Sequence, residues 1–131
     1  MRLRDVEDVS KLTPAMQQYA NLKKNNESSL LFFRMGDFYE LFFDDAIITA
    51  KELNITLTKR GRVLNESIPM CGIPFHAANN YVPKLVKKGF EIAICEQTSS
   101  PEEMSLKGVK GPLTREVTRI ITPGTLIFRG K

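Results

Sequence analysis

Apolar and polar positions follow one another in short blocks, and the blocks predict a series of helices and strands. Thr13-Pro14 predicts a helix start, because threonine suits the N-cap and proline suits the first helical position. Asn25-Asn26 is expected to end that helix. The continuous apolar run from Leu30 to Arg34 predicts a central strand. The turn dipeptide Gly36-Asp37 then joins it to a second strand, Phe38 to Phe42, as a β-hairpin.

The next block predicts a helix and a half-buried strand. Asp44 or Asp45 is expected to cap a helix that runs to Leu53, where Asn54 closes it. Residues 55–58 alternate between isoleucine or leucine and threonine, which is typical of a strand. That strand is expected to lead into a basic loop, Lys59-Arg60-Gly61-Arg62.

The second half of the chain predicts further short elements. Pro83 is acceptable in a helix only in or near its first turn, so the start of the third helix is open. The expected elements are a short extended piece at 68–70, a turn at 72–74, a helix over about 78–88 closed by Gly89, a strand at 91–97, a polar loop at 99–111 with at most one helical turn, and a last strand at 114–122.

The order of these elements, α-β-β-α-β-α-β-β, predicts an α/β fold of the α+β type. We expect a mixed β-sheet flanked by α-helices, and not a doubly wound parallel sheet. The 131 residues fit one domain. The polar residues 1–11 are expected to form a flexible N-terminal segment.

Composition narrows the class of protein only moderately. Hydrophobic residues make up 42% and charged residues 26%, which is ordinary for a globular protein, and the net charge of +4 permits a polyanionic partner without proving one. Cys71 and Cys95 are expected to be free, buried thiols of a cytoplasmic protein. The single histidine, His76, has no cluster of ligands around it, so no zinc site is predicted. The apolar runs are too short for a membrane partner.

Phe38 and Glu40 form the most informative pair in the sequence. Side chains alternate along a strand, so these two share one face, while Tyr39 and Leu41 share the other. Phe38 alone is more often a core residue. A carboxylate rarely faces a core unpaired, however, which favours an exposed Phe38 beside Glu40. An aromatic ring next to a carboxylate can probe a flat, polar object such as a nucleic-acid base.

Other functions are weighed against this reading. A metal-dependent nuclease would use magnesium, but the spacing of its candidate residues argues against it, and these residues are Asp37, Glu40, Asp44, Asp45 and Lys59. No phosphate-binding glycine loop is present. A protein-interaction module could use an exposed Phe38 as its anchor. The basic loop is either a phosphate-contacting or simply a solvated segment.

The sequence resembles the N-terminal mismatch-recognition domain of the bacterial MutS family of DNA mismatch repair proteins. The resemblance covers residues 12 to about 126. The matching stretches are Thr13 to Tyr19, Phe33 to Phe42, Leu57 to Gly61, Ile68 to Ala77, Ala93 to Gln97 and Thr122 to Thr125. It implies a mismatch-recognition domain over 12–127, followed at 128–131 by the start of a linker to further domains.

The resemblance also implies functions for individual residues. Phe38 is expected to enter the minor groove of double-stranded DNA and stack on a mispaired base or a base of a small insertion/deletion loop. Glu40 is expected to hydrogen-bond that base. Lys59 and Arg60 are candidates for backbone contacts, and Met70 for packing in the groove, although Met70 is equally well explained as core.

For this fragment the resemblance implies no catalysis and no cofactor. ATP and magnesium are expected to bind other domains of the parent protein, which acts as a homodimer with a downstream mismatch repair protein. Glu40 repels phosphates, so it is expected to penalise DNA that offers no hydrogen bond in return. Against a purine N7, an acceptor, Glu40 would have to be protonated.

Overall fold

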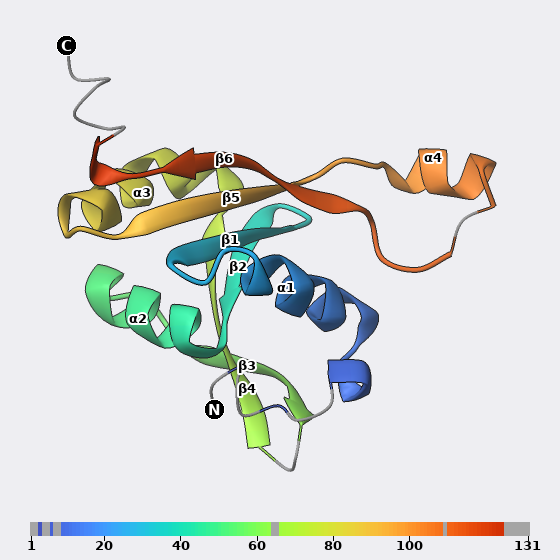
Figure 1. Cartoon of the computed structure of the whole chain (residues 1–131), viewed down its shortest axis with the longest axis horizontal. Helices are drawn as coiled ribbons and strands as arrows, with labels where there is room; N and C mark the ends of the chain where they lie inside the picture. Colours follow the sequence, from blue (N-terminus) through green and yellow to red (C-terminus); the bar gives the residue numbers. More distant parts are fainter. Residues whose placement is uncertain (1–2, 4–5, 7–8, 64–65, 109, 125–131) are drawn as a thin grey trace.

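A six-stranded mixed sheet forms the centre of the molecule (Figure 1). A computed structural model describes residues 3, 6, 9–63, 66–108 and 110–124, without the side chains of residues 62 and 63. Neighbouring strands follow the order β3-β4-β2-β1-β5-β6. Only β1 and β5 pair in parallel among the described strands. The strands are β1 (Ser29–Met35), β2 (Phe38–Phe42), β3 (Thr58–Val63), β4 (Glu66–Pro74), β5 (Glu91–Gln97) and β6 (Arg115–Ile121).

Helices cover both faces of this sheet. Helix α1 (Pro14–Lys24) lies on one face, and α2 (Phe43–Leu53) and α3 (Ala78–Lys87) lie on the other. The remaining helical elements are α4 (Pro101–Leu106) and the 3-10 turns η2 (Val9–Lys11) and η3 (Phe75–Ala77). The fold is therefore of the α+β type with a mixed sheet, as the sequence predicts. Among the described helices, none has the length and apolar character that crossing a lipid bilayer requires.

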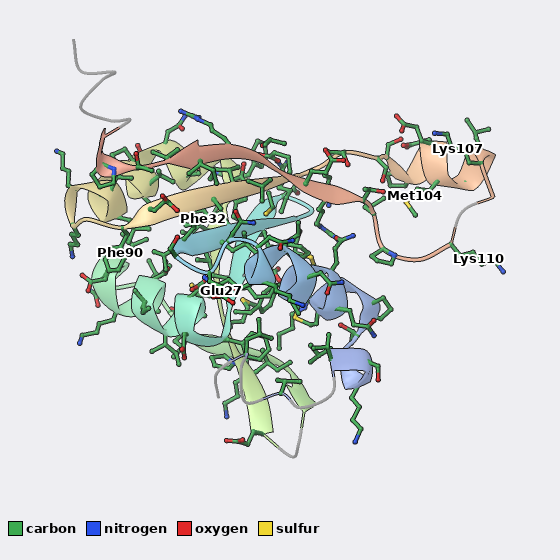
Figure 2. The ribbon with its side chains drawn as sticks, viewed as in Figure 1. Glu27, Phe32, Phe90, Met104, Lys107 and Lys110 are labelled. Carbon is green, nitrogen blue, oxygen red and sulfur yellow. The ribbon has the colours of Figure 1, made fainter. Side chains whose placement is uncertain are left out.

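Alternating side chains of β1 divide the core into two clusters. Leu30 and Phe32 pack with α2 and α3 on one face, and Phe32 lies in the middle of the molecule (Figure 2). Leu31 and Phe33 pack with α1 on the other face. Tyr19 of α1 sits over Phe33, with ring centroids 5.5 Å apart in an edge-on arrangement. Residues Ser29 to Phe33 of this central strand are buried, which explains the continuous apolar run in the sequence.

Several predicted elements are confirmed. Thr13 caps α1, accepting a hydrogen bond from the amide of Met16 at 3.3 Å. Asn54 closes α2 in the left-handed conformation. Gly89 follows α3 with a φ of 97°, which suits glycine. The predicted strand at 91–97 is β5, and the single helical turn expected in the polar loop is α4, which projects from the body of the molecule with Met104 and Lys107 (Figure 2).

Other predicted elements differ in their details. The segment at 55–57 is not a strand, and the predicted basic loop and the turn at 72–74 are instead parts of β3 and β4, which form a hairpin with a bulge between Lys59 and Arg62. The element order consequently gains one strand and the helix α4. Pro83 lies inside α3, past its first turn. The helix tolerates it although one hydrogen-bond donor is lost.

The predicted cap of α2 is also wrong. The helix begins at Phe43, and its N-cap residue, Phe42, makes no side-chain cap hydrogen bond. Asp44 and Asp45 lie in the first turn instead. Asp45 is buried and accepts a hydrogen bond from the amide of Leu31 at 3.0 Å, so its side chain joins α2 to β1.

Candidate nucleic-acid interface

The β1–β2 hairpin positions Phe38 at the first residue of β2. Gly36 has a φ of 61° and the register pairs Met35 with Phe38, a two-residue turn that needs glycine at its first central position. Phe38 is 44% exposed, whereas Tyr39 is 6% exposed and Leu41 is fully buried. The two faces of β2 are therefore arranged as the alternation predicts.

Strand β4 supports the exposed ring from one side. Phe38 pairs with Pro74, and Glu40 pairs with Gly72. A Cβ atom added to Gly72 would lie 3.6 Å from Cδ2 of Phe38, so the ring edge lies over the glycine. The amide of Phe75 also donates to the carbonyl of Asp37 at 2.8 Å, which ties the hairpin turn to η3. The ring thus extends from a well-anchored backbone.

Glu40 shares the face of Phe38 but is much less exposed. Its side chain is 13% exposed, and Nη1 of Arg60 donates to its Oε1 at 3.1 Å. Burial raises the pKa of this carboxyl, while the positive charges of Arg60 and Arg115 act in the opposite direction. The carboxylate is thus held in a mostly dry position whose charge depends on two arginines.

Arg115 is a residue of this region that the sequence did not reveal. It is 8% exposed, and its guanidinium lies 4.5 Å over the ring of Phe33. Its Nε donates to the carbonyl of Arg34 at 2.6 Å, and its Nη1 donates to Oε1 of Gln18 at 2.7 Å. Burial lowers the pKa of Arg115, and the charge of Glu40 opposes this. No sequence signal identifies it, because its position depends on how β6 pairs.

The basic residues and Met70 lie on the neighbouring hairpin. Lys59 and Arg60 are exposed on β3, not in a loop, and the side chain of Arg62 lies outside the described residues. Met70 on β4 is partly buried, pairs with Phe42 and packs against the cluster that contains α1. Lys59 and Arg60 are therefore available at the surface, whereas Met70 also belongs to the core.

The carboxylates considered for a nuclease are not gathered at one point. Asp37 is exposed in the hairpin turn and Asp44 is exposed on α2. Asp45 is buried and lies 3.0 Å from Nζ of Lys23. Within the described part of the chain, no group of three or more histidine, cysteine or acidic side chains is placed to hold a metal ion.

A second polar cluster fixes the opposite face of β2. The hydroxyl of Tyr39 donates to Glu96, which also pairs with Arg34 at 2.9 Å. The Arg34 guanidinium lies 4.1 Å from the ring centroid of Phe75. Burial, with help from Glu96, raises the pKa of Tyr39 to about 12, so it stays a donor. This cluster holds the strand that carries Phe38 and Glu40.

Comparisons with known proteins find related sequences. The family model described as MutS domain I matches residues 13–129. A protein of Bartonella quintana (strain Toulouse), named DNA mismatch repair protein MutS, is 55% identical over 116 residues. The match covers 88% of this chain and 13% of that relative, so the chain spans a small part of the relative's length.

Proposed function

This chain belongs to the MutS domain I family, and from that premise we propose that it recognises mispaired or unpaired bases in double-stranded DNA. Phe38 stacks on the base from the minor groove, and Glu40 hydrogen-bonds it. The observation that carries the proposal is the exposed ring of Phe38 beside a carboxylate, on a sheet face that is otherwise core.

The energetics of the duplex explain how such a pair can discriminate. Inserting an aromatic wedge into a base step costs a few kcal/mol of unstacking. A mismatched step has already lost part of its pairing and stacking, so it costs less to open. Stacking a base on an aromatic ring returns about 1–3 kcal/mol. The domain therefore distinguishes mismatched from paired DNA because a mismatched base step costs less free energy to open. One site can accept many mismatches for the same reason.

Backbone contacts are assigned to two residues of the neighbouring strand β3. Lys59 is exposed on β3 and carries the charge that a phosphate contact needs. Arg60 is 43% exposed, so it can reach a phosphate only in competition with Glu40. Met70 can contribute its exposed part to groove packing, since only part of it is covered. These contacts orient the duplex while Phe38 and Glu40 test the base.

Within a whole mismatch repair protein, we propose that this domain supplies lesion recognition and no catalysis. ATP and magnesium would bind elsewhere in such a protein, which would act in the cytoplasm as a homodimer with a downstream mismatch repair protein. Small insertion or deletion loops are proposed ligands as well as mismatches, because both present an unstacked base.

Fluorescence anisotropy with two matched oligonucleotide duplexes tests the proposal. One duplex carries a single unpaired thymine and the other is fully paired. We expect tighter binding to the first, with an affinity that falls steeply as salt rises, because phosphate contacts release counterions. Equal binding to both duplexes would contradict the proposal. A DNA affinity that does not change with salt would instead favour a protein-interaction module anchored by Phe38.

A further inference from the structure

The ion pair between Arg60 and Glu40 spans three strands of the sheet. Arg60 lies on β3, Glu40 lies on β2, and β4 runs between them. At the point where β4 pairs with Glu40 its residue is Gly72, which has no side chain. An added Cβ at Gly72 would have the ring edge of Phe38 at 3.6 Å as its one neighbour within 4 Å among the described residues, so no side chain of β4 stands between Arg60 and Glu40 at this point. The arginine side chain can therefore cross β4 to reach the carboxylate.

This contact occupies only one of the two carboxylate oxygens. Nη1 of Arg60 donates to Oε1 at 3.1 Å, and Oε2 accepts no hydrogen bond from the described residues. A carboxylate has about four acceptor positions, so a second donor can bind while the first remains. A base N–H that reaches Glu40 therefore does not have to displace Arg60.

We infer that Arg60 is a positioning residue for Glu40: it holds Oε1 and leaves Oε2 as the acceptor for an N–H donor of a displaced base. The inference rests on the proposed function of Glu40 and adds to it the residue that positions its carboxylate. An ionised carboxylate can only accept hydrogen bonds. The preferred bases are therefore those that present a ring N–H, as an unpaired thymine or guanine does, over those that present only an acceptor.

In the surroundings of Glu40, Arg60 is needed to keep the carboxylate ionised. Burial disfavours the ionised carboxylate, and the charges that favour it come from Arg60 on β3 and Arg115 on β6. The neighbours of Glu40 on β1 and β4 are Phe33 and Gly72, which carry no charge. The guanidinium of Arg115 is already bound to Gln18 and two backbone carbonyls, so Arg60 is the direct partner.

The competing role for Arg60 is a plain phosphate contact, and Lys59 provides the matched control. Lys59 is the preceding residue on the same strand, carries the same charge and is exposed. Replacing either residue by glutamine removes one positive charge from β3. A phosphate contact by Arg60 predicts that Arg60→Gln, like Lys59→Gln, weakens binding to paired and mismatched DNA alike, whereas a positioning role predicts that Arg60→Gln lowers the preference for mismatched DNA.

The first measurement needs no DNA. The side-chain carboxyl of Glu40 is titrated by carbon-13 NMR in the 131-residue chain and in its Arg60→Gln, Arg60→Lys and Lys59→Gln variants. We expect the titration midpoint to move to higher pH in Arg60→Gln, to move less in Arg60→Lys and to stay in place in Lys59→Gln. Equal midpoints in Arg60→Gln and Lys59→Gln would overturn the inference.

The second measurement compares binding to the unpaired-thymine duplex and to the paired duplex, followed by NMR shifts so that weak binding is detected. Arg60→Gln is expected to lower the ratio of the two affinities about tenfold, and Lys59→Gln to weaken both affinities alike. Adding Arg60→Gln to Glu40→Gln should lower the ratio no further. If the ratio of the two affinities in Arg60→Gln equalled that of the parent chain, the inference would be overturned. If the parent chain itself shows no preference, the proposed function fails, while the titration still decides whether Arg60 positions Glu40.

Discussion

Arg60 donates a hydrogen bond to Glu40 at 3.1 Å from two strands away, so the acidic group beside the exposed Phe38 is neutralised within the protein. This relationship changes the expected effect of Glu40 on paired DNA. A bare carboxylate would repel phosphates directly. A paired one acts mainly by keeping Arg60 from the phosphates, so paired DNA forgoes a favourable contact. Both effects weaken non-specific binding to paired DNA, but withholding Arg60 weakens it less than direct repulsion would.

The exposed ring of Phe38 leads to the first prediction. Phe38→Ala should reduce the preference for mismatched over paired duplex about tenfold or more, because about 1–3 kcal/mol of stacking on the base is lost. The variant should unfold at nearly the same urea concentration as the parent, since the 44% exposed ring contributes modestly to the core. Anisotropy and urea titration measure the two effects.

Phe75 is the matched control for this substitution. Its ring is 43% exposed and it follows the residue that pairs with Phe38. Phe75→Ala should leave the mismatch preference unchanged, because its ring is engaged with the guanidinium of Arg34. If both variants lost the preference for mismatched DNA equally, the preference would depend on exposed aromatic surface at this end of the sheet in general. The specific position of Phe38 would then not matter.

Glu40 gives a prediction on pH-dependent stability. Burial raises the pKa of Glu40 in the folded chain, so the folded state binds the proton more tightly than the unfolded state. Below the unfolded pKa both states hold the proton and Glu40→Gln should be as stable as the parent. As pH rises through the folded pKa the parent loses stability, and Glu40→Gln should become the more stable chain. Urea unfolding at pH 4 and pH 7 measures the difference.

A charge-matched control separates this local effect from net charge. Glu116 is exposed on β6, so Glu116→Gln removes the same charge from the chain without changing a buried position. If the stability of the two variants changes with pH in the same way, the buried environment of Glu40 does not cause the pH-dependent gain in stability. On paired DNA, Glu40→Gln should bind more tightly than Glu116→Gln, because it also frees Arg60 for a phosphate.

The sequence predicts well what depends on neighbouring residues. The hairpin at Gly36-Asp37 and the faces of Phe38 and Glu40 follow from a local turn and the two-residue period of a strand. The bounds of β5 follow from its apolar run. The continuous apolar run in β1 likewise identifies a strand with side chains buried on both faces.

Long-range pairing explains what the sequence does not predict. The residues Lys59 to Arg62 have a polar, loop-like pattern, but pairing with β4 makes them a strand. That pairing brings Arg60 to Glu40, which is 20 positions away in sequence. Arg115 approaches Arg34 from 81 positions away. A sequence pattern carries no information on such contacts unless the order of strands in the sheet is known.

Asp45 yields a prediction on stability, with its neighbour as control. Its buried carboxylate binds the amide of Leu31 and Nζ of Lys23, and so connects α2, β1 and α1. Asp45→Asn should destabilise the chain by about 1–3 kcal/mol, because an amide turns a donor toward the lysine. Asp44→Asn, on an exposed position, should change stability by less than about 0.5 kcal/mol. Equal effects of the two substitutions, measured by urea unfolding, would contradict this reading.

Both cysteines are expected to be unreactive in the folded chain. Burial, aided by nearby acidic groups, raises the pKa of the thiols of Cys71 and Cys95 to about 12. Since the thiolate is the reactive form, alkylation by iodoacetamide at pH 8 should be slow and should accelerate only when urea unfolds the chain. Mass spectrometry after timed quenching measures this. A native rate equal to the unfolded rate would show that the thiols are accessible.

Thr49 offers a test of the core itself. It is fully buried in α2, and its hydroxyl Oγ1 has no hydrogen-bond partner among the residues that the structure describes. Burying a polar group without a partner costs about 1–3 kcal/mol. Thr49→Val keeps the branched shape and removes the hydroxyl, so we expect stabilisation of about 1 kcal/mol and a rise in Tm of about 4 °C. Thr49→Ser, which keeps the hydroxyl and loses the methyl group, should lower Tm instead. If Thr49→Val also melts lower than the parent in differential scanning calorimetry, the hydroxyl must be satisfied in solution, and α2 must pack differently against the sheet that carries Phe38 and Glu40.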